Sequence, residues 1–462
     1  MHAPLILLLA LLSLSLTGLS QSPAKPAEPL TWKAGVATAV ITPGSNMYMA
    51  GYASRNKPSE GKAQDLFAKA LAIEDAGGYR LVFVTIDLIG IPRTMRKSLE
   101  TRVASAYQLK PEQLLLNASH THCGPEFRVG RAPADEGEFN PSKQGEQYGK
   151  ELENKVFSLI GEALKQLAPA RLAYTRARCG FAMNRRLPLP NGDYRNAPYP
   201  DGPVDHDVPV LRVDGADGKL RAVLFGYACH NTTLSFYQFC GDYAGFAQEY
   251  LQADNPGVTA LFMTGCGGDQ NPYPRGTLDL AQKHGRSLAT SVEAALFATA
   301  RPLTGSLRAA YSEITLNYAP PPSREEFAAR LKSKDKFEST HAQRMLEKLD
   351  KGEVLPKTYS YPVHVVQLGH ELKLIALGGE VVVDYSLRFK REFGGSGSVW
   401  VAGYSNDVMA YIPSERILKE GGYEGGGAMR FSSVHPGPWA SGLEEQIANK
   451  VKELDRAVRP NR

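Results

Sequence analysis

Short apolar runs rich in Val, Ile, Leu and Phe alternate along this chain with longer stretches of helical periodicity. The clearest run is LVFVTIDLI at 81–89, which has the length and continuity of a buried strand. Similar runs predict further strands at 113–118, 208–213, 222–228, 258–264, 362–368, 372–377 and 398–402. Helical patterns cover 95–107, 146–167, 278–300 and 444–456, and the charged stretch 323–351 predicts an exposed helical insertion.

This alternation predicts an α/β fold with a mixed β-sheet core flanked by helices. Polar residues follow directly after five of the predicted strands, and ligand sites in open α/β sheets gather beyond the carboxyl ends of strands. We therefore expect an active site at these strand ends. The residues concerned are His120, His122, His230, Asp269, Asn271, Glu380, Asn406 and Tyr411.

The first twenty residues carry no Lys, Arg, Asp or Glu, and 5–16 is an almost unbroken apolar run. This run is too short to span a bilayer comfortably, so it predicts a signal peptide at 1–20, although a basic residue is missing before it. Residues 21–32 read as a Pro/Ala-rich linker. No later segment holds eighteen uninterrupted apolar residues. We therefore expect a secreted or periplasmic protein that is soluble after processing.

Composition narrows the class of protein only a little. The 462 residues are 43% hydrophobic and 22% charged, an ordinary globular balance that argues against disorder or a coiled coil. The net charge of +5 is spread without a basic tract, which argues against nucleic-acid binding but allows weak peripheral contact with an anionic membrane. Five cysteines without a Cys-x-x-Cys pair argue against a disulfide scaffold, while a single bridge stays open.

Two histidine motifs carry candidate metal chemistry. In SHTHCGPEF, at 119–127, a His-x-His on a strand would place both imidazoles on one face. Both could bind one metal, or one could bind while the other moves protons, or both could be loop histidines bonded to backbone. His230, in YACHNTTL, is a ligand candidate or a structural histidine, and Asn231 begins a glycosylation sequon.

Three further segments add residues whose role the pattern leaves open. GCGGDQNP, at 265–272, is either a turn that lets backbone amides approach a ligand or a tight turn that closes a strand; it lacks the Lys of a phosphate loop. Glu380, in LGGEVVV, needs a metal or an Arg partner if it is buried, and none if it faces solvent. Tyr411 and Tyr423 read by type alone as packing residues.

Together these segments resemble the neutral, or non-lysosomal, ceramidase family. The similarity rests on MAGYASR near Gly51, SHTHCGPEF, MNRR at 183–186, YACHNTTL, GGDQNP, GGE, and AYIPSERILKEGGYEGG, in that order from about residue 35 to 435. SHTHCGPEF is the most specific of them. The resemblance implies a zinc ion bound by His120, His230, Glu380 and Tyr411, with His122, Arg185 and Tyr423 orienting the scissile amide and stabilising its oxyanion.

Two departures from the family pattern affect this expectation. Asn271 stands where the family has Ser, so we expect a water activated by zinc, and not a serine, to attack the substrate, with Asn271 holding substrate or water. The chain is also expected to lack the C-terminal β-sandwich domain that family members commonly carry, because it ends at Arg462. We expect residues 33–462 to form one ceramidase-like catalytic domain.

The function implied by the resemblance is zinc-dependent hydrolysis of an N-acyl sphingoid, or a related N-acyl lipid, to a fatty acid and an amine. Two alternatives stay open. The same zinc fold could act on a different N-acyl or ester substrate, or the chain could be an inactive exported binding protein, because fold does not fix function.

Overall fold

The computed structural model describes residues 30–128 and 141–459, with the side chains of 141 and 142 excepted. The predicted signal peptide at 1–20, and all but the last three residues of the predicted linker, lie outside the described residues.

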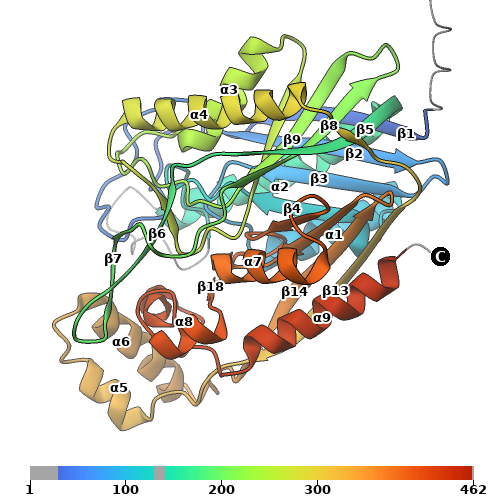
Figure 1. Ribbon diagram of the computed structural model, residues 1–462. Coiled ribbons are helices and arrows are strands. Elements are labelled where there is room, and N and C mark those ends of the chain that lie inside the picture. The colour runs from blue at the N-terminus through green and yellow to red at the C-terminus, as the bar shows by residue number, and fades with distance from the viewer. Residues whose placement is uncertain (1–29, 129–140, 460–462) are drawn as a thin grey trace, which may run out of the picture.

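A large mixed sheet forms the centre of the molecule (Figure 1). Its strands run in the order β10-β9-β8-β5-β1-β2-β3-β4, with β12 beside β5. The β3–β4 and β9–β10 pairs are parallel and the other pairs are antiparallel. The strands are β1 (Trp32–Val40), β2 (Phe67–Asp75), β3 (Arg80–Ile86), β4 (Leu114–Ala118), β5 (Ala168–Arg178), β8 (Asp207–Gly215), β9 (Leu220–Tyr227), β10 (Thr259–Thr264) and β12 (Arg301–Pro302).

A smaller sheet packs face to face on the large one. Apolar side chains from both sheets, among them Leu81, Phe83, Leu374 and Trp400, are buried together between them. Because side chains alternate along a strand, the neighbours of these residues in each strand point to the outer face of their sheet. The small sheet runs in the order β13 (Leu307–Asn317), β14 (Thr358–Leu368), β15 (Leu372–Leu377) and β17 (Val399–Ala402).

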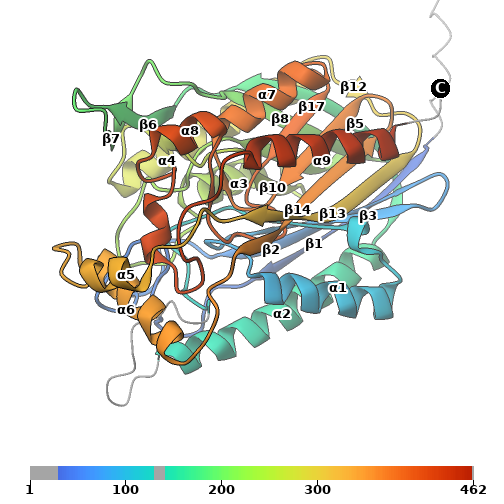
Figure 2. The same ribbon diagram turned by 90° about the horizontal axis from the view of Figure 1, so that it is seen from below.

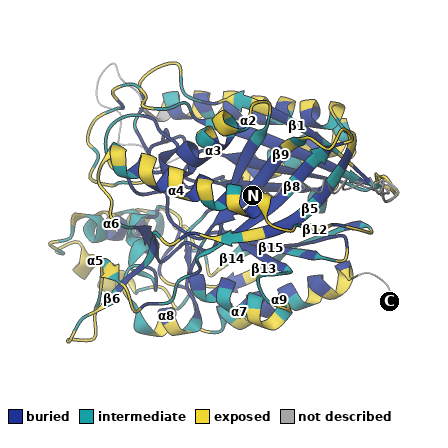
Figure 3. Ribbon diagram, turned by 45° about the horizontal axis from the view of Figure 1, so that its top comes forward, coloured by how far each residue is buried: buried dark blue, intermediate teal, exposed yellow. Residues whose placement is uncertain are grey.

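Helices cover the outer face of each sheet, which gives four layers in the order helix, sheet, sheet, helix (Figure 3). The large sheet is covered by α1 (Arg93–Tyr107), α2 (Pro141–Lys165), α3 (Asp242–Asp254) and α4 (Leu278–Phe297). The small sheet is covered by α7 (Val383–Phe393) and α9 (Leu443–Val458). In Figure 2, α1 and α2 lie side by side on the face of the large sheet turned away from α9.

Smaller elements gather at one end of the layers. They are β6 (Ala182–Pro188), β7 (Tyr194–Tyr199), β11 (Gln270–Pro272), β16 (Glu380–Val381), β18 (Tyr411–Ile412), α5 (Arg324–Arg330), α6 (Lys336–Asp350), α8 (Glu415–Glu420) and η2 (Gly427–Phe431). The short helix η1 (Pro111–Gln113) instead leads into the start of β4, at the opposite end. Helices α5 and α6 bury a small cluster of their own around Phe327, Ala342 and Met345. Figure 1 shows this pair beside α8, below β6 and β7.

The predicted α/β architecture with a mixed sheet flanked by helices is confirmed, and the predicted strands are present within a few residues of their expected bounds. The predicted 323–351 insertion is helical but not simply exposed, since Phe327 and Met345 are fully buried. The second sheet was not predicted. Of the helices in the described ranges, none combines the length and the hydropathy that crossing a membrane requires.

Asn117, the penultimate residue of β4, ties together the strand ends where the site was predicted. Its Nδ2 donates to Gly403 O at 2.8 Å and to Ser405 Oγ at 3.1 Å, just after β17, and its Oδ1 accepts from Thr264 N at 2.8 Å, at the end of β10. Since β4 and β10 are the two edges of the large sheet, these bonds bring its edges together at their carboxyl ends and join them to the small sheet.

The five cysteines, all within the described residues, are buried and unbonded to one another. Burial raises the pKa of each thiol, and that of Cys123 reaches about 12. The structure therefore agrees with the expectation that no disulfide scaffold holds this chain.

Candidate active site

His120 and His122 lie just beyond the end of β4, the strand-end position that the sequence predicted, so the alternation expected of a His-x-His on a strand does not apply to them. His120 has a φ of +61°, so the chain turns out of the sheet at this residue. The two imidazoles nevertheless turn toward the same point, with their Nε2 atoms 3.2 Å apart. The prediction that the rings converge is therefore confirmed, although a turn and not the alternation of a strand produces the convergence.

His230 reaches the same point from the end of β9. Its Nδ1 lies 2.6 Å from Gly267 O, and the Nδ1 of His120 lies 2.6 Å from Ile89 O. A carbonyl can only accept, so each Nδ1 carries the proton and each Nε2 presents a lone pair. Two such lone pairs directed at one point are typical of histidines that hold a metal.

Glu380 and Tyr411 complete the cluster from the paired short strands β16 and β18, in which they are register partners. Glu380 Oε2 lies 3.2 Å from Nε2 of both His120 and His230. Tyr411 Oη lies 3.3 Å from His230 Nε2. The side chain of Glu380 is 17% exposed, so the alternative that it faces solvent is wrong; it opens on the cavity described below.

These separations fit the donor set that zinc prefers. Zn²⁺ binds His nitrogen and carboxylate oxygen at about 2.0–2.2 Å in a tetrahedron, whose edges are then roughly 3.3–3.6 Å. The separations involving His120, His230, Glu380 and Tyr411, at 3.2–3.3 Å, lie close to this range. His120, His122 and His230 also offer three nitrogens within 4.8 Å of one another, so the residues present could hold the metal in either combination.

The charge states also suit a cation. Burial, together with the charge of Arg185, lowers the pKa of His230 to about 4. Burial and the neighbouring imidazoles hold the pKa of His122 well below its usual value. Although burial opposes its ionisation, interaction with His120 and His230 keeps the pKa of Glu380 well below the usual range. Neutral imidazoles around a carboxylate are the protonation states that bind a metal.

Arg185, from β6, lies behind the cluster and is almost fully buried. It donates through Nη2 to Tyr411 Oη at 2.9 Å, through Nε to Glu424 Oε1 at 2.8 Å, and through Nη1 to Asn271 Oδ1 at 3.2 Å. Asn271 Oδ1 also accepts from Thr232 Oγ1 at 3.2 Å. The structure thus brings Arg185 and Asn271 together beside Tyr411, as the residues of one hydrogen-bonded group.

Tyr423 packs edge-on against the Tyr411 ring of this group. Its ring centroid lies 5.3 Å from that of Tyr411, and the Arg185 guanidinium lies 5.8 Å from its ring. Burial raises its pKa to about 12, so at neutral pH the phenol is a hydrogen-bond donor. The eight residues to which the resemblance gave a role, among them Arg185, Asn271 and Tyr423, therefore lie in one cluster or touch it. Of the other strand-end residues, Asn406 accepts from Leu116 N at 3.1 Å and has a structural role.

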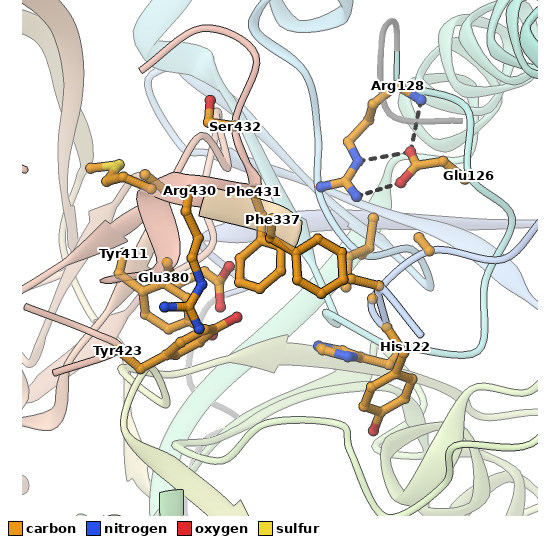
Figure 4. Close-up of a pocket in the computed structure, with 18 of the residues that line it drawn as sticks. His122, Glu126, Arg128, Phe337, Glu380, Tyr411, Tyr423, Arg430, Phe431 and Ser432 are labelled. Carbon is orange, nitrogen blue, oxygen red and sulfur yellow. Dashed lines mark hydrogen bonds and ion pairs between the residues drawn. The ribbon is translucent and has the colours of Figure 1, made fainter. Parts of the chain in front are cut away.

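A cavity of about 650 Å³ opens above the cluster. Its lining includes His120, His122, Glu380, Tyr411 and Tyr423. In Figure 4 the side chains of Glu380, Tyr411 and Tyr423 line one side and His122 the other. This volume lies within the range of pockets that hold small-molecule ligands.

The Gly-rich turn, a candidate for ligand contact, and the glycosylation sequon at Asn231 have structural roles instead. A Cβ on Gly267 would lie 2.8 Å from Cys229 N, and one on Gly268 would lie 2.6 Å from Glu380 O. The glycines of the 265–272 turn thus let the strand ends pack against one another. Asn231 is fully buried, and its Nδ2 donates to Ser119 O, so the sequon is not accessible in the folded chain.

The residues that hold His122 in place were not found from the sequence. A Cβ on Gly51 would lie 2.5 Å from two atoms of the His122 ring, and the Tyr52 ring centroid lies 4.8 Å from that ring. Arg55 donates to His122 O at 2.5 Å and to Phe236 O at 2.9 Å. The MAGYASR segment marked this loop, but nothing in its pattern assigned it to His122.

Comparison with known proteins shows the family that this chain resembles. Residues 32–276 match the family model described as neutral/alkaline non-lysosomal ceramidase, N-terminal. A neutral ceramidase of Drosophila pseudoobscura pseudoobscura is 32% identical over 269 residues, which cover 56% of this chain and 34% of that protein. One of Drosophila melanogaster is 32% identical over 100 residues, covering 21% and 14%. The chain thus aligns with only about a third or less of the length of these relatives.

Two solved structures share the fold. Neutral ceramidase from Pseudomonas aeruginosa superposes with a TM-score of 0.71 at 20% identity, covering 93% of this chain and 74% of that one. A ceramidase complexed with C2 superposes with a TM-score of 0.72, also at 20% identity, covering 93% and 75%. The family model spans more than half of the chain and includes both histidine motifs, and the chain therefore belongs to the neutral/alkaline non-lysosomal ceramidase family.

Proposed function

We propose that this protein is a zinc-dependent amide hydrolase that cleaves an N-acyl lipid of the ceramide type into a fatty acid and an amine. One observation carries the proposal: the Nε2 atoms of His120 and His230 both lie 3.2 Å from Glu380 Oε2, at the floor of a ligand-sized cavity. Family membership supports the reaction class, and the names of the relatives support a ceramide-like substrate.

His120, His230, Glu380 and Tyr411 would hold the zinc. When bound there, the ion supplies a Lewis acid for the substrate carbonyl and lowers the pKa of a water ligand toward neutrality. Burial raises the pKa of the Tyr411 phenol well above its ordinary value, so its oxygen needs a cation beside it to lose the proton, and Arg185 is one such cation at 2.9 Å.

His122 would move the proton. Within the described part of the chain its Nδ1 makes no hydrogen bond, in contrast to the carbonyl-bonded Nδ1 of His120 and His230, so no carbonyl holds the proton on that nitrogen. Its depressed pKa keeps it neutral and able to accept. We assign to its Nε2 the proton of the attacking water and its transfer to the leaving amine.

Arg185 and Tyr423 would stabilise the oxyanion that forms as the amide carbonyl is attacked. Asn271 would act through Arg185: its carboxamide has no acidic proton to lose and its Oδ1 already accepts two hydrogen bonds. Its presence where the family has Ser therefore supports attack by water and a positioning role at this residue.

The test is zinc content measured together with fatty acid release from a labelled ceramide. His120→Ala should lose both zinc and activity. His284→Gln is the matched control, because His284 is a buried histidine that bonds Pro274 O and stacks on Phe181, apart from the cluster. Stoichiometric zinc in purified His120→Ala, or activity unaffected by zinc removal, would refute the assignment; no zinc in the wild-type protein would favour an inactive binding protein.

Export is a separate part of the proposal. The apolar segment 5–16 and the small residues before Gln21 support cleavage of a signal peptide after Ser20. Sequencing of the amino terminus of the secreted or periplasmic protein tests this, and a mature protein that still begins at Met1 would contradict it.

A further inference from the structure

One face of helix α6 lines the mouth of the active-site cavity. Lys336, Thr340 and Arg344 occupy positions i, i+4 and i+8 and all border the cavity, as residues on one helical stripe do. Two of these three residues are cations, and they belong to the 323–351 insertion, whose sequence had suggested nothing more than an exposed face.

A third cation faces them from η2. The guanidinium of Arg430 extends into the cavity on the side of Tyr411 and Tyr423 (Figure 4), and its charge acts on the Tyr423 phenol. Among the described residues, the ion-pair partner of Arg430 is Asp335 at 3.3 Å, and both side chains are more than a third exposed. Such a pair contributes little, so Arg430 keeps most of its capacity to bind another anion.

The carboxylates of the cavity wall do not neutralise this rim. Glu126 is bound by Arg128, Glu424 by Arg185, and Glu380 belongs to the histidine cluster. For Lys336 and Arg344, in contrast, no carboxylate of residues 30–128 or 141–459 forms an ion pair within 4.0 Å. As far as the described residues go, the part of the cavity lined by α6 and η2 therefore carries an excess of positive charge.

An aromatic wall joins the histidine cluster to this rim. Ring centroids follow one another from Tyr411 to Tyr423 at 5.3 Å, from Tyr423 to Phe431 at 6.1 Å, and from Phe431 to Phe337 at 4.8 Å. At the outer end Arg430 lies 5.2 Å from the Phe431 ring and Lys336 lies 5.1 Å from the Phe337 ring. Apolar surface thus runs from the centre outward and ends at cations.

We infer that the preferred substrate is an anionic amphiphile: an N-acyl compound that carries an oxyanion, such as a phosphate or carboxylate, separated from the scissile amide by an aliphatic segment. The aliphatic segment would lie along the aromatic wall, and the oxyanion would be bound by Lys336, Arg344 and Arg430. This inference rests on the proposed function for the position of the amide, but its binding component does not depend on turnover.

Binding is tested first, with dodecyl phosphate and dodecyl maltoside as probes of equal chain length in calorimetric titrations of the zinc-loaded protein. Dodecyl phosphate should bind about tenfold more tightly, and raising NaCl from 50 to 500 mM should remove most of that preference. The Lys336→Ala/Arg344→Ala and Arg430→Ala variants should each weaken phosphate binding about threefold to fivefold per charge removed.

Lys332→Ala/Lys334→Ala is the matched control, since these exposed lysines lie in the same insertion but do not border the cavity, and it should keep the preference. Equal affinity for the two probes would overturn the inference. So would phosphate affinity unchanged in the rim variants, which would mean that phosphate binds at the histidine cluster instead.

Hydrolysis then separates this inference from the proposed function. The substrates are N-dodecanoyl-8-aminooctyl phosphate and its neutral alcohol, and kcat/KM should favour the phosphate about tenfold in the wild type and much less in the rim variants. Cleavage of both at equal rates overturns the inference and leaves the proposed function standing. Cleavage of neither, with rim-dependent binding intact, overturns the assignment of this compound class as substrate, while fatty acid release from labelled ceramide decides the proposed function.

Discussion

The ring of His122 leaves no room for a β-carbon at residue 51. Gly51 has a φ of +99°, and a Cβ there would lie 2.5 Å from ring atoms of His122. Gly51→Ala should therefore displace the imidazole that we assign to proton transfer, and lower kcat by about 10- to 100-fold. Zinc content, measured on the same sample, should stay stoichiometric because the four proposed ligands are untouched.

Gly61→Ala separates this collision from backbone strain. Gly61 has a φ of +103° with nothing within 4 Å of an added Cβ, so both variants strain the backbone but only one meets the imidazole. Gly61→Ala should lose about 1 kcal/mol of stability and keep its kcat. Equal losses of kcat in the two variants would show that strain, not contact with His122, is responsible.

Asp269 gives a pH dependence at a single residue. It is fully buried, it accepts from Val383 N at 2.8 Å and Asn184 Nδ2 at 3.0 Å, and burial raises its pKa to about 6. The ordinary Asp pKa in an unfolded chain is about 3.9. Between about pH 4 and pH 6 the folded state thus binds more protons than the unfolded state, so this group's contribution to stability falls as pH rises.

Comparison of Asp269→Asn with the wild type isolates this term. The free energy of unfolding of the wild type minus that of the variant should fall by roughly 1–3 kcal/mol from pH 4 to pH 6.5 and be flat above. Urea unfolding at several pH values measures it. A difference that rises with pH over this window would mean that the folded carboxyl has a lowered pKa, contrary to its burial.

At the scale of elements, the Asn117 side chain links three strand ends by hydrogen bonds. Asn117→Ala removes its bonds to Thr264, Gly403 and Ser405 and leaves buried polar groups without partners. We expect a loss of about 2–4 kcal/mol in the free energy of unfolding, measured in urea. Asn191→Ala, in the exposed turn between β6 and β7, should change it by less than about 0.5 kcal/mol.

The strands, and the polar residues that follow them, could be predicted from the sequence because hydrophobic runs reflect burial directly. The position of His120 and His122 after a strand was predicted, but strand alternation as the reason for their convergence was wrong, since the turn at His120 depends on a positive φ that non-glycine residues seldom adopt. The role of Gly51 could not be predicted either: it depends on the distance between two loops that are neighbours only in the folded chain.

The extent of the sheets was also beyond the sequence pattern. Strands such as β13, which holds several half-buried polar residues, lack the continuous apolar run that marks β3. The residues of the site were predicted more completely than the residues around it, because the resemblance to the family named the proposed ligands and their partners. Glu424 and Arg55 were not predicted, because they act through contacts that no sequence spacing encodes.

At the scale of the whole molecule, the two sheets share one core and should unfold together. Leu374, from the small sheet, is 1% exposed among residues of both sheets. Leu374→Ala should cost about 2–5 kcal/mol and lower the melting temperature without splitting the transition. Trp32 and Trp400, one from each sheet, are both buried in this core, so fluorescence and far-ultraviolet circular dichroism should give one midpoint.

Val434→Ala is the control, since Val434 is 51% exposed and its loss should shift the midpoint little. Two separate midpoints in Leu374→Ala would show that the sheets are independent folding units, and the site between their strand ends would then be the first part to open.

The rate at which the buried cysteines react with a thiol reagent measures such opening. A neutral thiol shielded from solvent reacts with iodoacetamide only when the surrounding structure parts. The cysteines lie in three separate buried clusters, with Cys123 and Cys240 in one, Cys179 and Cys229 in a second and Cys266 in a third. Their labelling rates, located by peptide mass, would therefore show which layer of the molecule admits reagent first and how often.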